Sequence, residues 1–402
     1  MTSRAEAFAK ELASKSPGRP TYALEAVDLV LAEARTLGAS DIHWLPTAEG
    51  LALSWRIDGV LQPAALLPVG VAPNVVARLK VLAELLTYRT DVPQEGRLRV
   101  ASGEVEMRLS TFPTLYGEKA VVRLFAASGR FLRLDDLGLP DEIRDRLREL
   151  LQNTSGAIVL SGPAGSGKTT TIYACLRELV ETSKGQRSLT TLEDPIEVPV
   201  PGVSQSQVNA AAGFTLEVGL RSILRQDPEV ITVGEIRDPA TAEIAFQASL
   251  TGHLVLTTYH AGSASGVVGR LVDMGIEPYL LRSGILAIVC QRLVRRLCTC
   301  ATPTEDPAAF LGLAVERAYV PTGCPECVST GYRGRAILAE LLLPDRGELG
   351  QAIIAREDVA QLERAAVKGG MTSLWERARL AVEAGTTSPA EVRRVLGPSG
   401  SS

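Results

Sequence analysis

One octapeptide in the 402-residue sequence has the residue types and spacing of a phosphate-binding loop. Glycines allow such a loop to turn its backbone N–H groups toward phosphate oxygens, and a helix that follows adds a favourable dipole. We predict that Lys168 binds the β- and γ-phosphates of a nucleotide and that the Thr169 hydroxyl coordinates Mg²⁺. The predicted binding residues are Gly162, Pro163, Ala164, Gly165, Ser166, Gly167, Lys168, Thr169 and Thr170.

The sequence around this loop supplies the two elements that it requires. A short apolar run, too short for a helix, precedes it, and a segment with helical spacing follows. Further apolar runs alternate with helical segments along the chain, which predicts an α/β fold with a parallel sheet covered on both faces. The expected strands are 157–161, 188–192, 230–233 and 254–258, and the expected helices include 169–179 and 216–224.

Acidic residues follow two of the expected strands. Glu193, Asp194 and Glu197 come after the second strand, and Glu235 follows the third. Because parallel strands bring their carboxyl ends to one ligand crevice, we expect both groups near the phosphate loop, where a carboxylate could orient the attacking water. The alternative for the first group is a solvated turn, since Asp-Pro dipeptides often open loops.

Two histidines, His253 and His260, bracket the fourth expected strand. A histidine beside a strand is most often a hydrogen-bonded core residue. Because this strand adjoins the expected phosphate crevice, the competing interpretation is that a histidine senses the state of the γ-phosphate.

The remaining sequence divides into further segments. Short alternating runs at 51–57, 104–111 and 119–125, after a helical segment at 23–37, predict a small α+β domain. Beyond Cys290 we expect a Cys-bearing insertion and then small helices. The expected organisation is a loose N-terminal tail with room for a helical turn or two (1–20), the α+β domain (21–126), a linker (127–140), the α/β domain with the Cys motif at 298–327 (141–345) and a C-terminal helical subdomain (346–402).

Composition narrows the class of function. The chain has 42 Lys and Arg against 46 Asp and Glu and no basic stripe, which argues against direct nucleic-acid binding. Uncharged stretches contain too many polar residues or prolines for lipid, and the start lacks the apolar core of a signal peptide, so we expect neither a transmembrane segment nor export. Six cysteines then indicate a reducing, cytoplasmic compartment, where clustered cysteines bind metal more often than they form disulfides.

Together these motifs resemble the secretion ATPases that drive type II secretion and type IV pilus assembly. The resemblance extends from about residue 23 to residue 396 and includes the phosphate loop and the acidic box through Glu197. The other motifs that carry it are Ala39-Ser40-Asp41-Ile42-His43, Arg56-Ile57-Asp58-Gly59-Val60-Leu61, Pro93-Gln94-Glu95-Gly96-Arg97, Arg108 through Gly117-Glu118-Lys119 to Arg123, Leu220-Arg221-Ser222-Ile223-Leu224-Arg225-Gln226-Asp227-Pro228, Gly234-Glu235-Ile236-Arg237-Asp238, Thr251-Gly252-His253 and Gly331-Tyr332-Arg333-Gly334-Arg335.

The resemblance implies a RecA-like P-loop ATPase core preceded by a PAS-like domain, in a homo-hexamer that hydrolyses ATP between the two domains. Glu197 matches the catalytic glutamate and Glu235 the Walker B acid, with Gly234 where many P-loop enzymes have Asp. After His260 the family usually has Thr-Asn, where this chain has Ala261-Gly262. The resemblance nominates six arginines that approach the γ-phosphate in a closed state, each with an ordinary surface arginine as the alternative: Arg108, Arg123, Arg221, Arg225, Arg237 and Arg335.

Two cysteine pairs lie where assembly and secretion members carry a four-Cys zinc ribbon. The pairs are Cys298-Thr299-Cys300 and Cys324-Pro325-Glu326-Cys327. Four thiolates meet the tetrahedral preference of Zn²⁺, so the resemblance implies structural zinc. Because the first pair is one residue shorter than the usual C-x-x-C, a site without metal or with reduced thiols is the alternative. Cys175 and Cys290 are expected in the core.

The resemblance also implies partners. These are an inner-membrane platform protein and cytoplasmic docking components of the secretion or pilus machine, which would hold the chain at the cytoplasmic side of the membrane. Residues 1–22 are too few for the extra docking domain of many assembly ATPases. The competing functions are a pilus retraction ATPase, which lacks the four-Cys module, a nucleotide-gated scaffold with little turnover, and a DNA translocase, which the acidic balance and 4% aromatic content disfavour.

Overall fold

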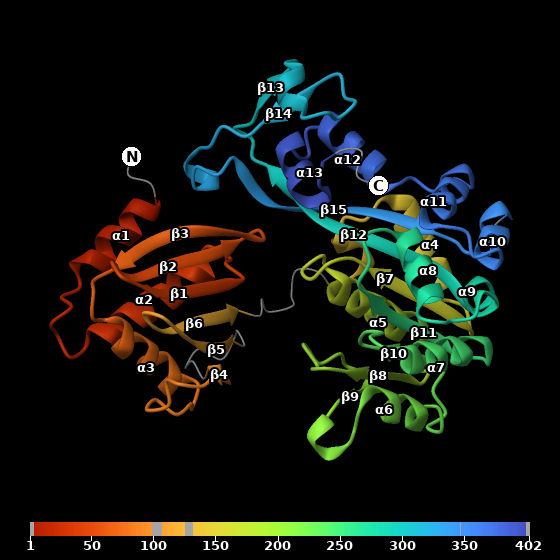
Figure 1. The fold of residues 1–402 in the computed structure, drawn as a ribbon, viewed down its shortest axis with the longest axis horizontal. Helices are drawn as coiled ribbons and strands as arrows, with labels where there is room; N and C mark the ends of the chain where they lie inside the picture. Colours follow the sequence, from red (N-terminus) through yellow and green to blue (C-terminus); the bar gives the residue numbers. More distant parts are fainter. Residues whose placement is uncertain (1–3, 99–106, 125–131, 346, 399–402) are drawn as a thin grey trace. The chain divides into compact units, whose positions relative to one another are not determined.

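The computed structural model describes residues 4–98, 107–124, 132–345 and 347–398, which form two compact units (Figure 1). The first unit comprises Met1–Gly129 with Thr322–Gly334, and the second comprises Arg130–Pro321 with Arg335–Ser402. In the part of the chain that the structure describes, no helix has both the length and the apolar character needed to cross a bilayer.

The first unit is an antiparallel sheet with helices. Within its described residues, six strands lie in the order β3-β2-β1-β6-β5-β4. The elements are α1 (Arg4–Ser14), α2 (Tyr22–Thr36), β1 (Asp41–Thr47), β2 (Gly50–Ile57), β3 (Val60–Leu67), α3 (Ala72–Leu82), β4 (Gln94–Leu98), β5 (Met107–Thr114) and β6 (Gly117–Leu124). The expected helix at 23–37 and strand at 51–57 are confirmed, and the expected strands at 104–111 and 119–125 are confirmed where the structure describes them.

The core of the first unit lies on one side of this sheet. Ile42 and Trp44 of β1 alternate with less buried neighbours and pack in one cluster with residues of the three helices. The tail expected at residues 1–20 differs from the structure, because α1 buries Phe8 and Leu12 in this cluster. The ring of Phe8 lies 5.0 Å from that of Trp55. The i, i+4 spacing of Phe8 and Leu12 places both on one helix face.

The second unit is built on a larger sheet with the order β15-β12-β7-β11-β10-β8-β9 among its described residues. From β12 to β9 the neighbouring strands are parallel, as expected. The elements are α4 (Asp141–Leu150), β7 (Gly156–Ser161), α5 (Lys168–Ser183), β8 (Leu189–Glu193), β9 (Ser204–Gln207), α6 (Leu216–Ile223), β10 (Val230–Val233), α7 (Pro239–Leu250), β11 (Leu254–Tyr259), α8 (Ala264–Asp273), α9 (Pro278–Gly284), β12 (Ile285–Leu297), β13 (Thr302–Thr304), β14 (Ala318–Val320), β15 (Tyr332–Leu342), α10 (Gly347–Ile354), α11 (Val359–Lys368), α12 (Leu374–Glu383) and α13 (Pro389–Leu396), with short 3-10 turns at Leu134–Leu137, Ala210–Ala212 and Pro307–Phe310. A further 3-10 turn, Pro325–Cys327, belongs to the segment Thr322–Gly334 of the first unit.

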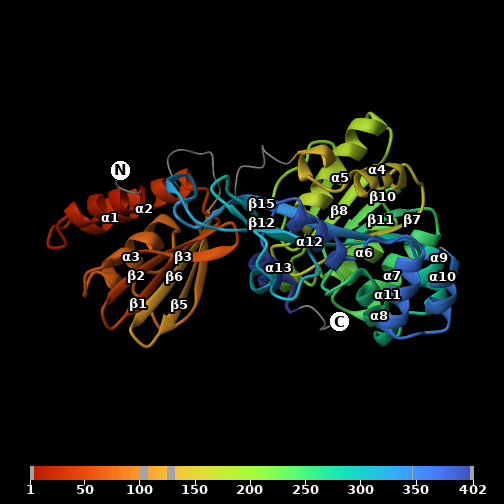
Figure 2. The ribbon, with the colours of Figure 1, turned by 90° about the horizontal axis from the view of Figure 1, so that it is seen from above.

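Both faces of this sheet are covered. Ala157 and Val159 of β7 pack into one cluster, whereas Ile158 and Leu160 pack into a second cluster with α4 and α5. Figure 2 shows α4 and α5 above the sheet and α7 and α8 below it. Because strand neighbours point to opposite faces, a central strand with helices on both sides is apolar at every position.

Polar side chains fix where several helices begin. Asp238, Ser263 and Ser373 precede α7, α8 and α12, and the side-chain oxygen of each accepts a hydrogen bond from a backbone N–H in the first turn. Such caps satisfy N–H groups that have no partner within the helix. These hydrogen bonds therefore fix the residue at which each preceding loop ends and the helix begins.

Candidate functional site

The phosphate loop lies between the last residue of β7 and the first residue of α5. Gly162 has φ +143°, and a Cβ there would come within 2.5 Å of the backbone oxygen of Gln291, so only glycine fits. Nζ of Lys168 donates to the carbonyl oxygens of Gly162 at 2.7 Å and Pro163 at 3.0 Å. The ammonium group therefore lies in the loop, beside the N-terminus of α5.

Burial of Lys168 has an electrostatic consequence. It lowers the pKa of the ammonium group, and the charge of Glu235 acts in the opposite direction. An anion close to Nζ would favour the charged form in the same way. Thr169 and Thr170 are exposed at the start of α5, as are Pro163, Ala164 and Gly165 of the loop. The loop thus presents hydroxyl and backbone groups to solvent above a buried cation.

Gln291 supports this loop from β12, a role that no sequence pattern indicated. Its side chain is fully buried, and Nε2 donates to the backbone oxygen of Ser166 at 2.8 Å. Its Oε1 accepts from the hydroxyl of Thr171 at 3.2 Å. One amide therefore joins the loop to the first turn of α5.

Glu235 follows β10 at the same edge of the sheet. The preceding Gly234 donates to the carbonyl of Leu192 in β8 at 2.8 Å and accepts from the hydroxyl of Thr258 in β11 at 2.7 Å. A Cβ at Gly234 would come 3.3 Å from the same carbonyl of Leu192. This close approach explains a glycine here, and it aims the following carboxylate at the loop side of the sheet.

The carboxylate of Glu235 has two cationic or potentially cationic neighbours. It pairs with Nε of Arg237, and Nε2 of His260 lies 3.3 Å from its other oxygen. Arg237 also lies 3.7 Å from Asp194 at the end of β8. The structure therefore brings together Lys168, Glu235, Arg237 and His260, as the carboxyl-end argument predicts.

Glu193 has a different role from the one expected for a water-orienting acid. It is buried, and its carboxylate accepts from the hydroxyls of Tyr173 at 2.5 Å and Thr191 at 2.6 Å and from Nε2 of Gln205 at 3.0 Å. Burial, then the hydrogen bond to Glu193, raises the pKa of Tyr173. The same tyrosine oxygen accepts from the backbone N–H of Glu197 at 3.1 Å. Glu193 thus anchors the segment that carries the half-buried Glu197.

The structure does not bring every nominated residue to the loop. His253 precedes β11, so it lies at the amino end of a strand whose carboxyl end is level with Ser161, about 20 Å away at the usual rise per residue. Its Nδ1 is 3.1 Å from the carbonyl oxygen of Ala248. His253 and His260 therefore lie at opposite ends of β11, and His260 lies at the end beside the phosphate loop.

Three further nominated arginines belong to the second unit. Arg221 pairs with Glu217 at 3.2 Å, and Arg225 donates to the backbone oxygen of Arg221, so both are engaged with α6. Arg335 is exposed near the start of β15.

Arginines of the first unit form a row across its sheet. Asp41 lies opposite Arg56 on β2 and opposite Arg123 on β6. Arg123 lies opposite Arg108, which in turn lies opposite Arg97. Directly opposite residues share a face of the sheet, so four guanidinium groups and one carboxylate share a face across five strands. Positive charge of this kind suits an anion such as phosphate.

The four cysteines of the insertion are brought together. Their sulfur atoms all lie within 4.8 Å of one another, and Cys298 and Cys327 are buried. The Cys327 sulfur accepts from the backbone N–H groups of Cys324 at 3.1 Å and Gly331 at 3.2 Å. Four sulfurs around Zn²⁺ at its usual bond length lie about 3.8 Å apart, so this donor set fits zinc with a small adjustment.

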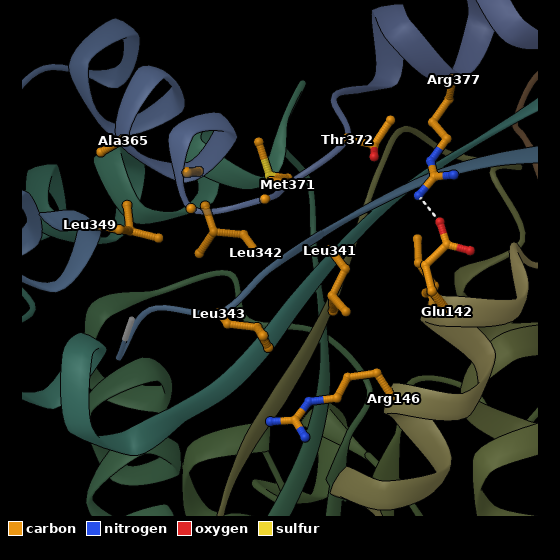
Figure 3. Close-up of a pocket in the computed structure, with 14 residues that line it drawn as sticks. Glu142, Arg146, Leu341, Leu342, Leu343, Leu349, Ala365, Met371, Thr372 and Arg377 are labelled. Carbon is orange, nitrogen blue, oxygen red and sulfur yellow. Dashed lines mark hydrogen bonds and ion pairs between the residues drawn. The ribbon is translucent and has the colours of Figure 1, made fainter. Parts of the chain in front are cut away.

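A cavity of about 260 Å³ lies among α4, the end of β15 and the C-terminal helices (Figure 3). Leu341, Leu342 and Met371 line its apolar side. Arg377 of α12 pairs with Glu142 of α4 at its rim (Figure 3). This ion pair joins α12 to the helix that precedes the phosphate-loop strand.

Comparisons with known proteins agree with this geometry. A family model described as Type II/IV secretion system protein matches residues 21–394. The chain is 42% identical over 381 residues to "Type II secretion system ATPase E" of Vibrio cholerae, which covers 92% of this chain and 75% of the relative. It is 37% identical to "Type IV pilus assembly ATPase PilB" of Thermus thermophilus, over 96% of this chain and 45% of that relative.

Solved structures share the fold. The X-ray structure of the Legionella pneumophila ATPase DotB has a TM-score of 0.68 at 22% identity, over 95% of this chain and 97% of that chain. The crystal structure of the pilus retraction motor PilT with bound ADP has a TM-score of 0.54 at 24% identity, over 91% and 98% of the two chains. The predicted fold class, a RecA-like P-loop core after a small α+β domain, is thereby confirmed.

Proposed function

Because the chain belongs to the type II/IV secretion system protein family, we propose that it is an ATPase that powers type II secretion or the assembly of a type IV pilus. The observation that carries the proposal is the position of Lys168. It lies inside a glycine loop between β7 and α5, with Glu235 at the end of a nearby parallel strand. Phosphoryl transfer depends on positioning and charge stabilisation, which this arrangement supplies.

Each group near the loop has a role in the proposed reaction. Lys168 and the backbone N–H groups of residues 164–169 bind the phosphates of ATP, and the Thr169 hydroxyl binds Mg²⁺, with Glu235 nearby. Glu197 orients the water that attacks the γ-phosphate, held in place through Tyr173 and Glu193. His260 reports on the γ-phosphate through its contact with Glu235.

Arginines complete the proposed site in a closed state. The arginine row supports a phosphate-facing role for Arg108 and Arg123, and Arg237 is already beside Glu235. Arg221, Arg225 and Arg335 act in a homo-hexamer whose domains close during hydrolysis. Charge that reaches the γ-phosphate only on closure couples cleavage to motion.

Two parts of the proposal concern the surroundings of the motor. Cys298, Cys300, Cys324 and Cys327 hold a structural Zn²⁺, which favours an assembly or secretion role over pilus retraction. The chain works in the cytoplasm beside the inner membrane, where a platform protein and docking components of the machine hold it and receive the motion.

Turnover by the purified full chain tests this function. We expect Mg²⁺-dependent ATP hydrolysis that falls at least about 100-fold in Glu197→Gln with nucleotide affinity retained, because only water activation is removed. Lys168→Ala should instead lose nucleotide binding. A nucleotide-gated scaffold would bind ATP but show equal, negligible turnover in the wild-type protein and in Glu197→Gln, which would overturn the proposal.

A further inference from the structure

A buried carboxylate on β15 joins two helices that the sequence places far apart. Glu340 is 1% exposed, and its Oε1 accepts from the backbone N–H of Ala264 at 2.6 Å. Its Oε2 accepts from the backbone N–H of Leu374 at 2.9 Å. Ala264 is the first residue of α8 and Leu374 the first of α12, so each oxygen faces the positive end of a helix dipole.

This carboxylate is retained at an energetic cost. Burial raises the pKa of Glu340, and the two N–H groups act in the opposite direction. Both oxygens of Glu340 accept a hydrogen bond, whereas the side chain of a glutamine has only one acceptor oxygen. An apolar residue here would leave two buried backbone N–H groups without this acceptor.

The loop that ends at Ala264 is held along its length. It comprises residues 260–263 and is called here the β11–α8 loop. Arg270 donates to the carbonyl of its first residue at 2.8 Å, and Arg292 donates to the carbonyl of Gly262 at 2.5 Å. The N–H of Ala261 donates to the hydroxyl of Ser161, the last residue of β7. The loop is therefore fixed to the strand that leads into the phosphate loop.

This loop carries the histidine beside Glu235. Nε2 of His260 is 3.3 Å from that carboxylate. Because Ala261 and Gly262 offer no large side chains, the backbone contacts decide where His260 points. Oε1 of Glu340 fixes the end of this loop at Ala264, and Oε2 of the same carboxylate contacts the first residue of α12.

We propose that Glu340 is a positioning residue for ATP hydrolysis, setting the β11–α8 loop and coupling it to the C-terminal helix α12. The proposal rests on the proposed function of the phosphate site. It predicts that nucleotide binding changes the stability of the first turn of α12. Leu374, which begins this helix, lies far along the chain from the phosphate loop.

A matched pair of variants tests the positioning role. Glu340→Gln should lower kcat about tenfold with KM for ATP within about twofold, because the loop shifts while the phosphate loop is intact. Glu142→Gln removes the other anchor of α12, its contact with Arg377 (Figure 3), and should leave kcat within about twofold. Unchanged kcat in Glu340→Gln, or an equal loss in both variants, overturns the proposal.

Amide hydrogen exchange of the wild-type protein provides a test that needs no variant to fold. A non-hydrolysable ATP analogue with Mg²⁺ should slow exchange at Ala264 and at Leu374 together, by at least about threefold. Slowing at Ala264 without a change at Leu374 overturns the coupling. Absence of hydrolysis by the wild-type protein would instead count against the proposed function, since the exchange measurement requires binding alone.

Discussion

Nε of Arg123 donates to Oδ1 of Asp41 at 3.0 Å across the paired strands β6 and β1. Asp41 is buried, whereas the Arg123 side chain is 65% exposed, so the carboxylate holds the base of a guanidinium group whose remaining donors face solvent. Nε of Arg56 lies 3.5 Å from the other oxygen of Asp41. Asp41 therefore orients an arginine that the proposed function assigns to the γ-phosphate.

Asp41→Asn should lower kcat about tenfold with less than about a twofold change in KM for ATP, because Arg123 loses its fixed direction. The measurement is steady-state ATP hydrolysis by the full chain. Arg56→Gln is the matched control, since it removes the second arginine beside Asp41 and should leave kcat within about twofold. Equal losses in the two variants would show that the strand pair, and not Arg123, is affected.

Gln291→Met should weaken nucleotide binding about tenfold, about 1.4 kcal/mol, because the Ser166 carbonyl and the Thr171 hydroxyl lose a buried partner. Titration with a fluorescent ADP measures the affinity. Thr171→Val removes the longer of the two Gln291 contacts, together with a 3.3 Å contact to the Gly167 carbonyl, and should cost less than about threefold. A Gln291→Met protein with wild-type affinity would refute the role of β12 in shaping the loop.

Glu391 predicts an acid-sensitive attachment of the C-terminal helix α13. Burial alone would raise its pKa, but hydrogen bonds from Arg394 and Arg295 outweigh burial and hold the pKa below the ordinary value of 4.5. The unfolded chain therefore takes up this proton first. The stability that these ion pairs supply is complete above about pH 4.5 and is lost as the pH falls through the lower native pKa.

Urea unfolding at about pH 7 and about pH 4 checks this prediction. Glu391→Gln should lower the free energy of unfolding by about 3 kcal/mol at neutral pH, because it removes the anionic partner of the mostly buried Arg295. The variant should also lose less stability on acidification than the wild-type protein. A variant with the same pH dependence as the wild type would assign the acid sensitivity to other carboxyl groups.

Zinc bound by the four cysteines should be measurable as about one equivalent in purified protein. Cys324→Ser together with Cys327→Ser should abolish it and lower Tm, because the metal cross-links two turns of the insertion. Cys175→Ala is the control, since that thiol is buried in α5 and should not affect zinc content. Metal content below about half an equivalent in the wild-type protein would contradict a structural site.

The central part of the larger sheet could be predicted from the sequence, whereas its edge on the β12 side could not. The strands β7, β10 and β11 are short, mostly apolar runs, and β8 is a short β-branched and apolar run that ends in Glu193; this is the pattern of buried parallel strands. β12 continues through Gln291, Arg292, Arg295 and Arg296, and these residues do not alternate as a half-buried strand would. Their partners lie far along the chain, so local patterns could not reveal the strand.

The candidate site shows the same division. The phosphate loop and Glu235 follow from motif and strand order, because both depend on short-range chemistry. Gln291, Glu340 and Asp41 were missed as supporting residues because polar side chains are usually exposed and periodicity reports only apolar burial. The sequence did not distinguish His253 from His260, because a position next to a strand does not say which end of the strand meets the ligand.

Lys168 and Tyr173 belong to the same helix, α5, little more than one turn apart. The helix that begins at the phosphate loop therefore also contacts the segment that carries Glu197, because the Tyr173 hydroxyl oxygen accepts from the Glu197 backbone N–H. Lys168 and the backbone of Glu197, the acid to which the proposed function assigns the attacking water, are consequently both attached to one helix. Helix α5 therefore fixes the positions of these groups. Control over when hydrolysis occurs would have to come from groups on other elements.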